Sequence, residues 1–70
     1  MFKAYLETEH FIFEAYGASE EEARAALLAG WEVHRVQYRA TAGFPDYADD
    51  VQVSEIRLGA AYRDREEIRS

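Results

Sequence analysis

The fold of this 70-residue chain is decided by the stretch Ser19-Glu20-Glu21-Glu22-Ala23-Arg24-Ala25-Ala26-Leu27-Leu28-Ala29. Ser19 and Glu22 have the spacing of a capping box, in which the Ser19 hydroxyl accepts a hydrogen bond from the Glu22 N–H. The carboxylates of the first turn also lie at the positive end of the helix dipole. Because the residues that follow are strong helix formers, the stretch predicts the start of a helix.

The length of this helix depends on Gly30. Apolar residues and one histidine recur at helical spacing through and beyond it, and this period predicts a helix over residues 19–38. In this interpretation Gly30 faces a strand and allows close approach. Glycine inside a helix costs roughly 0.5–1 kcal/mol relative to alanine, so a second interpretation stays open. There, Gly30 ends a shorter helix and residues 31–41 form a fourth strand.

A hairpin is predicted before the helix, because Phe2–Glu7 and Phe11–Tyr16 both alternate between apolar and polar residues. We expect a four-residue loop, Glu7–His10, and one wholly apolar face. The expected apolar pairs are Phe2 with Ala15, Ala4 with Phe13, and Leu6 with Phe11. On the other face the expected pairs are Lys3 with Glu14, Tyr5 with Ile12, and Glu7 with His10.

The chain after the helix is harder to assign. Residues 40–50 hold the only proline and three aspartates, which indicates an acidic loop. A last strand is expected from Val51 to about Tyr62, with Ile56 and Leu58 on its core face. Val51 and Val53 then fall on the other face, unless a bulge near Ser54 reverses them. The polar tail, about 63–70, is expected to fray.

These elements predict one small α+β domain, residues 1–70, with a ββαβ two-layer fold. The right-handed crossover rule gives a three-stranded antiparallel sheet of order 2-1-3, with the helix on one face. The expected core is Phe2, Ala4, Leu6, Phe11, Phe13, Ala15, Ala23, Leu27, Trp31, Ile56 and Leu58. The other face of the sheet is then bare, with an apolar centre and a polar rim typical of an interaction patch. The predicted partner-binding residues are Tyr5, Ile12, Tyr16, Glu14, Asp46, Tyr47, Asp49 and Asp50.

Composition argues against several functions. The chain has no cysteine, so it has neither a thiolate nucleophile nor a Cys-ligated zinc site. Its net charge of −6 argues against direct nucleic-acid binding, which normally needs a basic face. No stretch is long and apolar enough for a membrane span, and the first residues do not form a signal peptide. We therefore expect a cytoplasmic protein that does not bind membranes.

The two histidines are expected to be structural. His34 lies in the helix stripe, without the orienting carboxylate or cleft that a catalytic base needs. His10 lies beside Glu9 without metal-ligand spacing, and Asp46, Asp49 and Asp50 lack the pattern of a calcium loop. No phosphate-binding motif is present either. We therefore expect neither an enzyme nor a cofactor or metal site.

Two functions remain as hypotheses. The first is a small protein-interaction module that binds a protein partner, or a second copy of itself, through the bare sheet face. The second is an acidic inhibitor that mimics nucleic acid, of an antitoxin-like or phage anti-defence type, and blocks a basic surface of a nucleic-acid-binding protein. Carboxylates spread over the hairpin, the helix start, the loop and the tail suggest mimicry, although several arginines dilute that charge.

Overall fold

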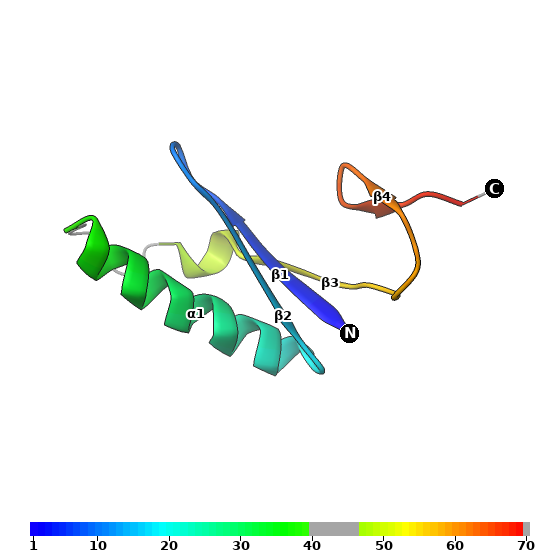
Figure 1. Cartoon of the computed structure of the whole chain (residues 1–70), viewed down its shortest axis with the longest axis horizontal. Helices are drawn as coiled ribbons and strands as arrows, with labels where there is room; N and C mark the ends of the chain where they lie inside the picture. The colour runs from blue at the N-terminus through cyan, green and yellow to red at the C-terminus, as the bar shows by residue number, and fades with distance from the viewer. Residues whose placement is uncertain (40–46, 70) are drawn as a thin grey trace.

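The computed structural model describes residues 1–39 and 47–69 and has an α+β two-layer fold (Figure 1). Two strands, β1 (Phe2–Glu7) and β2 (Ile12–Gly17), precede the helix α1 (Glu20–Gln37). A short 3-10 helix, η2 (Ala48–Asp50), leads into β3 (Gln52–Glu55). Two short strands, β4 (Tyr62–Arg63) and β5 (Glu66–Glu67), follow.

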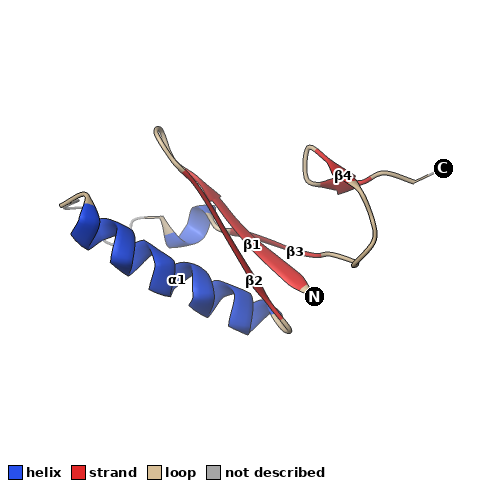
Figure 2. Ribbon diagram, in the orientation of Figure 1, coloured by secondary structure: helices blue, strands red, loops and turns tan. Residues whose placement is uncertain are grey.

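The three-stranded sheet is antiparallel and has the order β2-β1-β3, as the sequence predicts. The helix α1 covers one face of this sheet and packs mainly on β2 and β1 (Figure 2). The predicted two-layer arrangement is therefore confirmed, with β1 as the central strand.

The helix continues through Gly30, as the interpretation with the longer helix predicts. The Ser19 hydroxyl accepts from the Glu22 N–H at 3.1 Å, and Tyr38 is the C-terminal cap. Arg39 follows with a φ of 52°, the left-handed conformation that commonly ends helices. The alternative of a helix ending at Gly30 with a fourth strand over 31–41 is wrong. Gly30 does not face a strand either, because it is exposed and, among the described residues, no atom outside its own stretch of helix lies within 4 Å of where its Cβ would be.

The hairpin has the predicted faces but not the predicted pairing. Ala4 pairs with Ala15 and Leu6 with Phe13, which is a two-residue slip from the expected register. Because side chains alternate with period 2, a slip of two residues keeps every side chain on its face. The cause lies at the tip, where the Thr8 N–H donates to the Phe11 carbonyl at 2.8 Å. The Thr8 hydroxyl oxygen also accepts from the Phe11 N–H at 3.2 Å, so the loop is Thr8–Phe11.

The predicted length of the last strand is wrong, and of the two phases that the sequence left open the strand has the one with Val51 and Val53 toward the core. Val53 lies opposite Ala4 on the helix side of the sheet, and Val51 is buried there. The strand ends at Glu55, because the chain turns at residues 57–60, where the Ala60 N–H donates to the Arg57 carbonyl at 3.2 Å. Gly59 has a φ of 85°, which favours glycine and was the signal for this turn.

The core is small and lies between α1 and the sheet. Its buried residues are Ala4, Leu6, Ala23, Leu27, Trp31 and Val51. Four predicted core residues, Phe2, Phe13, Ala15 and Ile56, are only half-buried. Two others are exposed: Leu58 shows 80% of its surface because it lies beyond the end of β3, and Phe11 shows 38% because it belongs to the loop.

The predicted frayed tail is instead a second hairpin, which we call the C-terminal hairpin (β4, β5 and the turn between them). Tyr62 pairs with Glu67 and Arg63 with Glu66. Both turn residues, Asp64 and Arg65, have positive φ values of 51° and 69°, the requirement of a type I′ turn. The hairpin lies on the side of the sheet away from α1, so this face is not bare (Figure 1).

Candidate functional site

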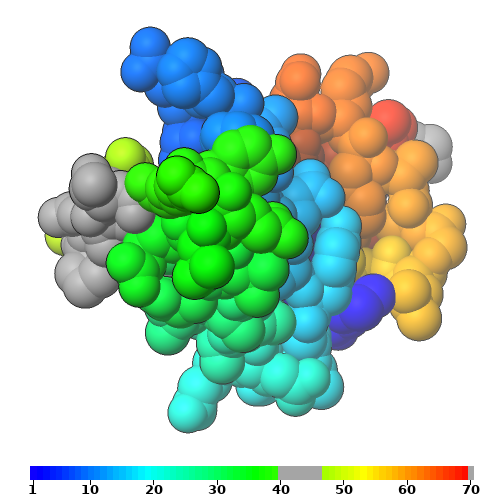
Figure 3. Space-filling model, turned by 60° about the vertical axis from the view of Figure 1, so that its left-hand side comes forward, coloured from blue at the N-terminus to red at the C-terminus, as the bar shows by residue number. Residues whose placement is uncertain are grey.

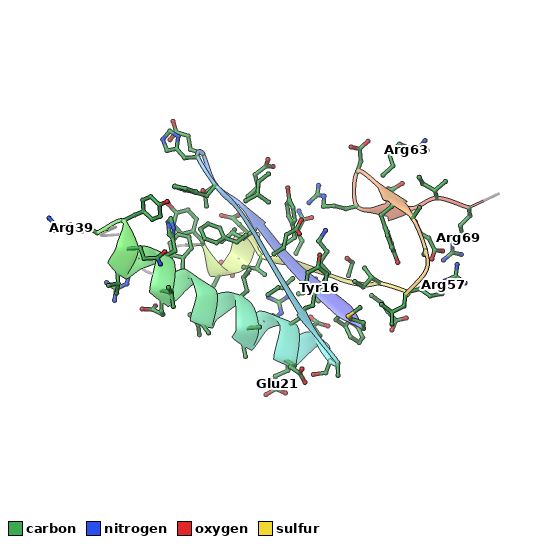
Figure 4. All side chains as sticks on the ribbon, in the orientation of Figure 1. Tyr16, Glu21, Arg39, Arg57, Arg63 and Arg69 are labelled. Atoms are coloured by element: carbon green, nitrogen blue, oxygen red, sulfur yellow. The ribbon has the colours of Figure 1, made fainter. Side chains whose placement is uncertain are left out.

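The predicted residues of the N-terminal hairpin do lie together on the side of the sheet away from α1. Tyr5 pairs with Glu14, and Glu7 pairs with Ile12, on the same face as Tyr16 (Figure 4). We call this the outer sheet face; its residues are Lys3, Tyr5, Glu7, Ile12, Glu14 and Tyr16.

The Glu14 carboxylate on this face forms an ion pair and a hydrogen bond with its neighbours. The Lys3 ammonium lies 3.3 Å from the Glu14 carboxylate, an ion pair diagonal to the strand pairing. The Tyr16 hydroxyl donates to the same carboxylate at 3.3 Å. Neither contact covers the apolar side chains, since Ile12 exposes 59% and Tyr16 exposes 48% of their surface.

The backbone of β2 completes this surface, because β2 is an edge strand. The Thr8 and Phe11 backbones pair by hydrogen bonding, so the alternation of an antiparallel ladder directs Phe13 and Ala15 toward β1. The N–H and C=O groups of Ile12, Glu14 and Tyr16 then point to the free edge. Figure 3 shows β2 at the surface, between the helix and the C-terminal segment.

The C-terminal hairpin covers Tyr5 most directly, and it also borders a small pocket that Tyr16 lines. The Arg65 guanidinium lies over the Tyr5 ring at 4.8 Å from its centre, and the Lys3 ammonium lies at 5.5 Å. Both are cation–π distances. Arg65 also donates to the Gln52 side-chain oxygen. Sequence reasoning missed this contact because it did not predict the C-terminal hairpin. Asp64, which lies in a polar segment with complementary charges on both sides, was a usable signal for the turn of that hairpin.

The predicted residues of the acidic loop do not form one site. Asp46 lies outside the described residues. Tyr47 is half-buried, with its ring 5.0 Å from that of Trp31, and so anchors the chain to the core. Asp49 and Asp50 are exposed and line a shallow hollow beside Tyr5. Of the four predicted residues of the acidic loop, Asp49 and Asp50 therefore lie next to the outer sheet face.

The C-terminal hairpin has its own charge centre at Glu67. Its carboxylate accepts from the Arg57 guanidinium at 3.1 Å and also from Arg69. Partial burial acts to raise the pKa of Glu67, but the hydrogen bond from Arg69 and the charges of both arginines outweigh it. The pKa of Glu67 is therefore below its ordinary value of 4.5.

The two histidines lie apart and in different surroundings. The His34 ring packs edge-on against Phe11 and Phe13, with centroids at 4.7 and 4.9 Å, and no carboxylate of the described residues pairs with it. His10 is exposed at the hairpin tip, 4.0 Å from Glu9. Within residues 1–39 and 47–69, no group of three or more acidic or histidine side chains is placed to hold a metal ion.

The comparisons with known proteins add no functional assignment. No protein family, no curated protein and no solved structure matches the chain. Across the part of the chain that the structure describes, no helix has the length and apolar character needed to cross a membrane.

Proposed function

We propose that this protein is a small cytoplasmic protein-interaction module that binds a protein partner, rather than an enzyme. The binding surface is the outer sheet face together with the free edge of β2. The observation that carries this proposal is the exposure of Ile12 and Tyr16, at 59% and 48%, on an edge strand of six residues.

An extended partner segment fits this edge. Natural proteins commonly protect a free edge with proline, lysine or a bulge, and β2 contains no proline or lysine. A segment that adds as a fourth strand would hydrogen-bond to the backbone groups of Ile12, Glu14 and Tyr16. Its alternate side chains would pack on the exposed Ile12 and Tyr16, which supplies apolar burial beside the backbone pairing.

The charge of the chain favours a basic partner. The net charge is −6, and among the described residues the carboxylates of Glu7, Asp49 and Asp50 form no ion pair. Carboxylates near a binding surface speed the encounter with a basic partner. Mimicry of nucleic acid is the weaker proposal, because Arg24, Arg35, Arg57 and Arg69 neutralise acidic side chains and interrupt the negative surface.

Photo-crosslinking from a defined position tests this function. A crosslinking amino acid replaces Ile12 in one protein and Leu28, exposed on the helix, in the control. In extract of the native host, we expect one protein adduct from position 12, and none from position 28. A Tyr16→Glu change in the same chain should reduce the adduct about tenfold, because it places a charge in the contact.

Two results would contradict the proposal. One is the same set of adducts from both positions, and the other is an adduct that Tyr16→Glu leaves unchanged. If the adduct from position 12 is a second copy of the chain, the surface serves self-association instead of a heterologous partner. Sedimentation of an Ile12→Glu variant then shows whether that association depends on this face.

A further inference from the structure

The side of α1 that turns away from the sheet is apolar. Ala26, Ala29, Val33 and Val36 follow each other at spacings of three, four and three residues, which places them on one face of a helix. We call these four residues the outward helix face. All four are exposed, and Val33 and Val36 show 57% and 74% of their surface. Among the described residues, no other element packs over this face.

This composition is unfavourable for a helix that faces only water. Solvent-facing positions of a surface helix usually carry charged or long polar side chains. Valine has a lower helix propensity than those residues, and Val33 and Val36 are both more than half exposed in the monomer, so burial offsets little of this cost. Both valines become favourable if the face is buried against another surface.

The spacing of the outward helix face is symmetric. Residue 31 is the midpoint between positions 26 and 36, and it is also the midpoint between positions 29 and 33. Two copies of α1 that pack antiparallel about a two-fold axis near this position would bring Ala26 beside Val36, and Ala29 beside Val33. A small residue then meets a larger one in every layer, which fills the space between the helices. Spacings of three and four residues are also those of helices that pack along their length.

The charges of α1 favour the same orientation. Glu20, Glu21 and Glu22 lie in its first turn, and Arg35 lies in its last turn, followed by Arg39. Antiparallel packing brings the acidic end of one helix to the basic end of the other, and it also opposes the two helix dipoles. A parallel pair would place like charges together. Glu21, Glu22 and Arg39 have no ion-pair partner among the described residues, so they are available for this contact.

We propose that the outward helix face is the interface of a homodimer, in which two copies of this chain pack their α1 helices antiparallel. This dimer uses the opposite side of the molecule from the outer sheet face. It leaves both copies of β2 free, and it does not depend on the proposed function.

Engineered disulfides test the orientation, since the natural chain has no cysteine. Ala29→Cys and Val33→Cys variants are mixed and oxidised, with Leu28→Cys, exposed on another side of the helix, as the control. We expect the mixed 29–33 disulfide to exceed either homodimeric disulfide about tenfold, because only antiparallel packing makes positions 29 and 33 neighbours. Predominant 29–29 disulfides, or no more cross-linking than the control shows, would overturn the proposal.

Sedimentation equilibrium tests the interface. We expect wild-type protein to dimerise with rising concentration, and Val33→Glu to weaken dimerisation at least about tenfold, because it buries a charge without a partner. Leu28→Glu is the matched control and should leave dimerisation unchanged. Circular dichroism confirms that each variant keeps its helix. A wild-type monomer at near-millimolar concentration overturns the proposal, and so does a dimer that Ile12→Glu abolishes and Val33→Glu does not.

Discussion

Gly17 and Gly30 differ in what surrounds the position where a side chain would begin. A Cβ on Gly17 would lie 2.5 Å from the Ala23 backbone nitrogen and 2.9 Å from the Glu22 Cβ, where the end of β2 meets the first turn of α1. A Cβ on Gly30 would meet no atom within 4 Å in the part of the chain that the structure describes, apart from its own stretch of helix. The first glycine permits the contact between helix and sheet, whereas the second only adds flexibility to the unfolded chain.

The two alanine variants should therefore change stability in opposite directions. Gly30→Ala should raise the free energy of unfolding by about 0.5–1 kcal/mol, since alanine restricts the unfolded chain more than glycine does. Gly17→Ala should lower it by about 1–3 kcal/mol, because helix backbone cannot easily move aside. Urea denaturation of dilute, monomeric protein measures both. A stabilised Gly17→Ala variant would show that β2 and α1 are not in close contact.

Arg65 and Arg63 form a second matched pair at this scale. Of these two arginines, Arg65 is the one whose guanidinium lies over the Tyr5 ring. Arg65→Gln should shift the ring-proton resonances of Tyr5 in NMR spectra, because it removes a cation from the ring face. Arg63→Gln should leave these resonances in place. Equal shifts in both variants would mean that the C-terminal hairpin does not place Arg65 on Tyr5.

Among the elements, the C-terminal hairpin depends most on charge. Its ladder is short, and Glu67 links it to Arg57 in the segment that leaves β3. Two-stranded hairpins are only marginally stable by themselves. The docking of this hairpin onto the outer sheet face therefore rests on a few polar contacts, and it should respond to pH.

The pH dependence has a definite direction. Because the pKa of Glu67 is lower in the folded hairpin than its ordinary value of 4.5, the folded form binds fewer protons near that pH. The stabilisation is fully present above pH 4.5 and is lost as the pH falls through the lowered pKa. We expect the Ile68 amide, which donates to the Ala61 carbonyl at 2.8 Å, to lose protection from hydrogen exchange below this pH.

Glu67→Gln is the control for this effect. The variant has no carboxylate at this position, so the acid-dependent step in Ile68 exchange should disappear. If the exchange of the Ile68 amide changes with pH as much in the variant as in the wild type, another acidic group causes the pH dependence.

At the scale of the whole molecule, the core is small for the chain that it supports. Among residues 1–39 and 47–69, Leu6 is the largest side chain that is fully buried. A chain of this length is expected to have a total stability of about 4–10 kcal/mol. The radius of gyration is 13.0 Å, compared with about 11 Å for a compact chain of this length, because the C-terminal hairpin extends beyond the two main layers.

Leu6→Ala and Leu58→Ala test where the core lies. Leu6→Ala should cost about 2–5 kcal/mol, because it leaves a cavity between α1 and the sheet. This is a large share of the total, so we expect a partly unfolded protein at room temperature. Leu58→Ala should change stability by less than about 0.5 kcal/mol, since Leu58 is 80% exposed. Thermal denaturation followed by circular dichroism distinguishes the two; equal losses would place Leu58 in the core after all.

The sequence by itself determined the features that depend on neighbouring residues. The Ser19 cap and the helical period set the helix, and alternation set the two faces of the first hairpin. The alternation of apolar and polar residues thereby placed Tyr5, Ile12, Glu14 and Tyr16 on one surface. Helix hydrogen bonds and strand alternation are local, and crossover handedness restricts the topology, so a single sequence is enough to predict them.

Only the tertiary structure decided the register, the phase of β3 and the path of the C-terminal segment. A two-residue slip leaves the apolar pattern unchanged, and the backbone and side-chain hydrogen bonds between Thr8 and Phe11 at the loop fix the observed pairing. Val51 and Val53 face the core because pairing with β1 directs them there. Arg65 reaches Tyr5 because the chain turns back after β3. These features depend on contacts between distant residues, and alternation along one strand does not contain that information.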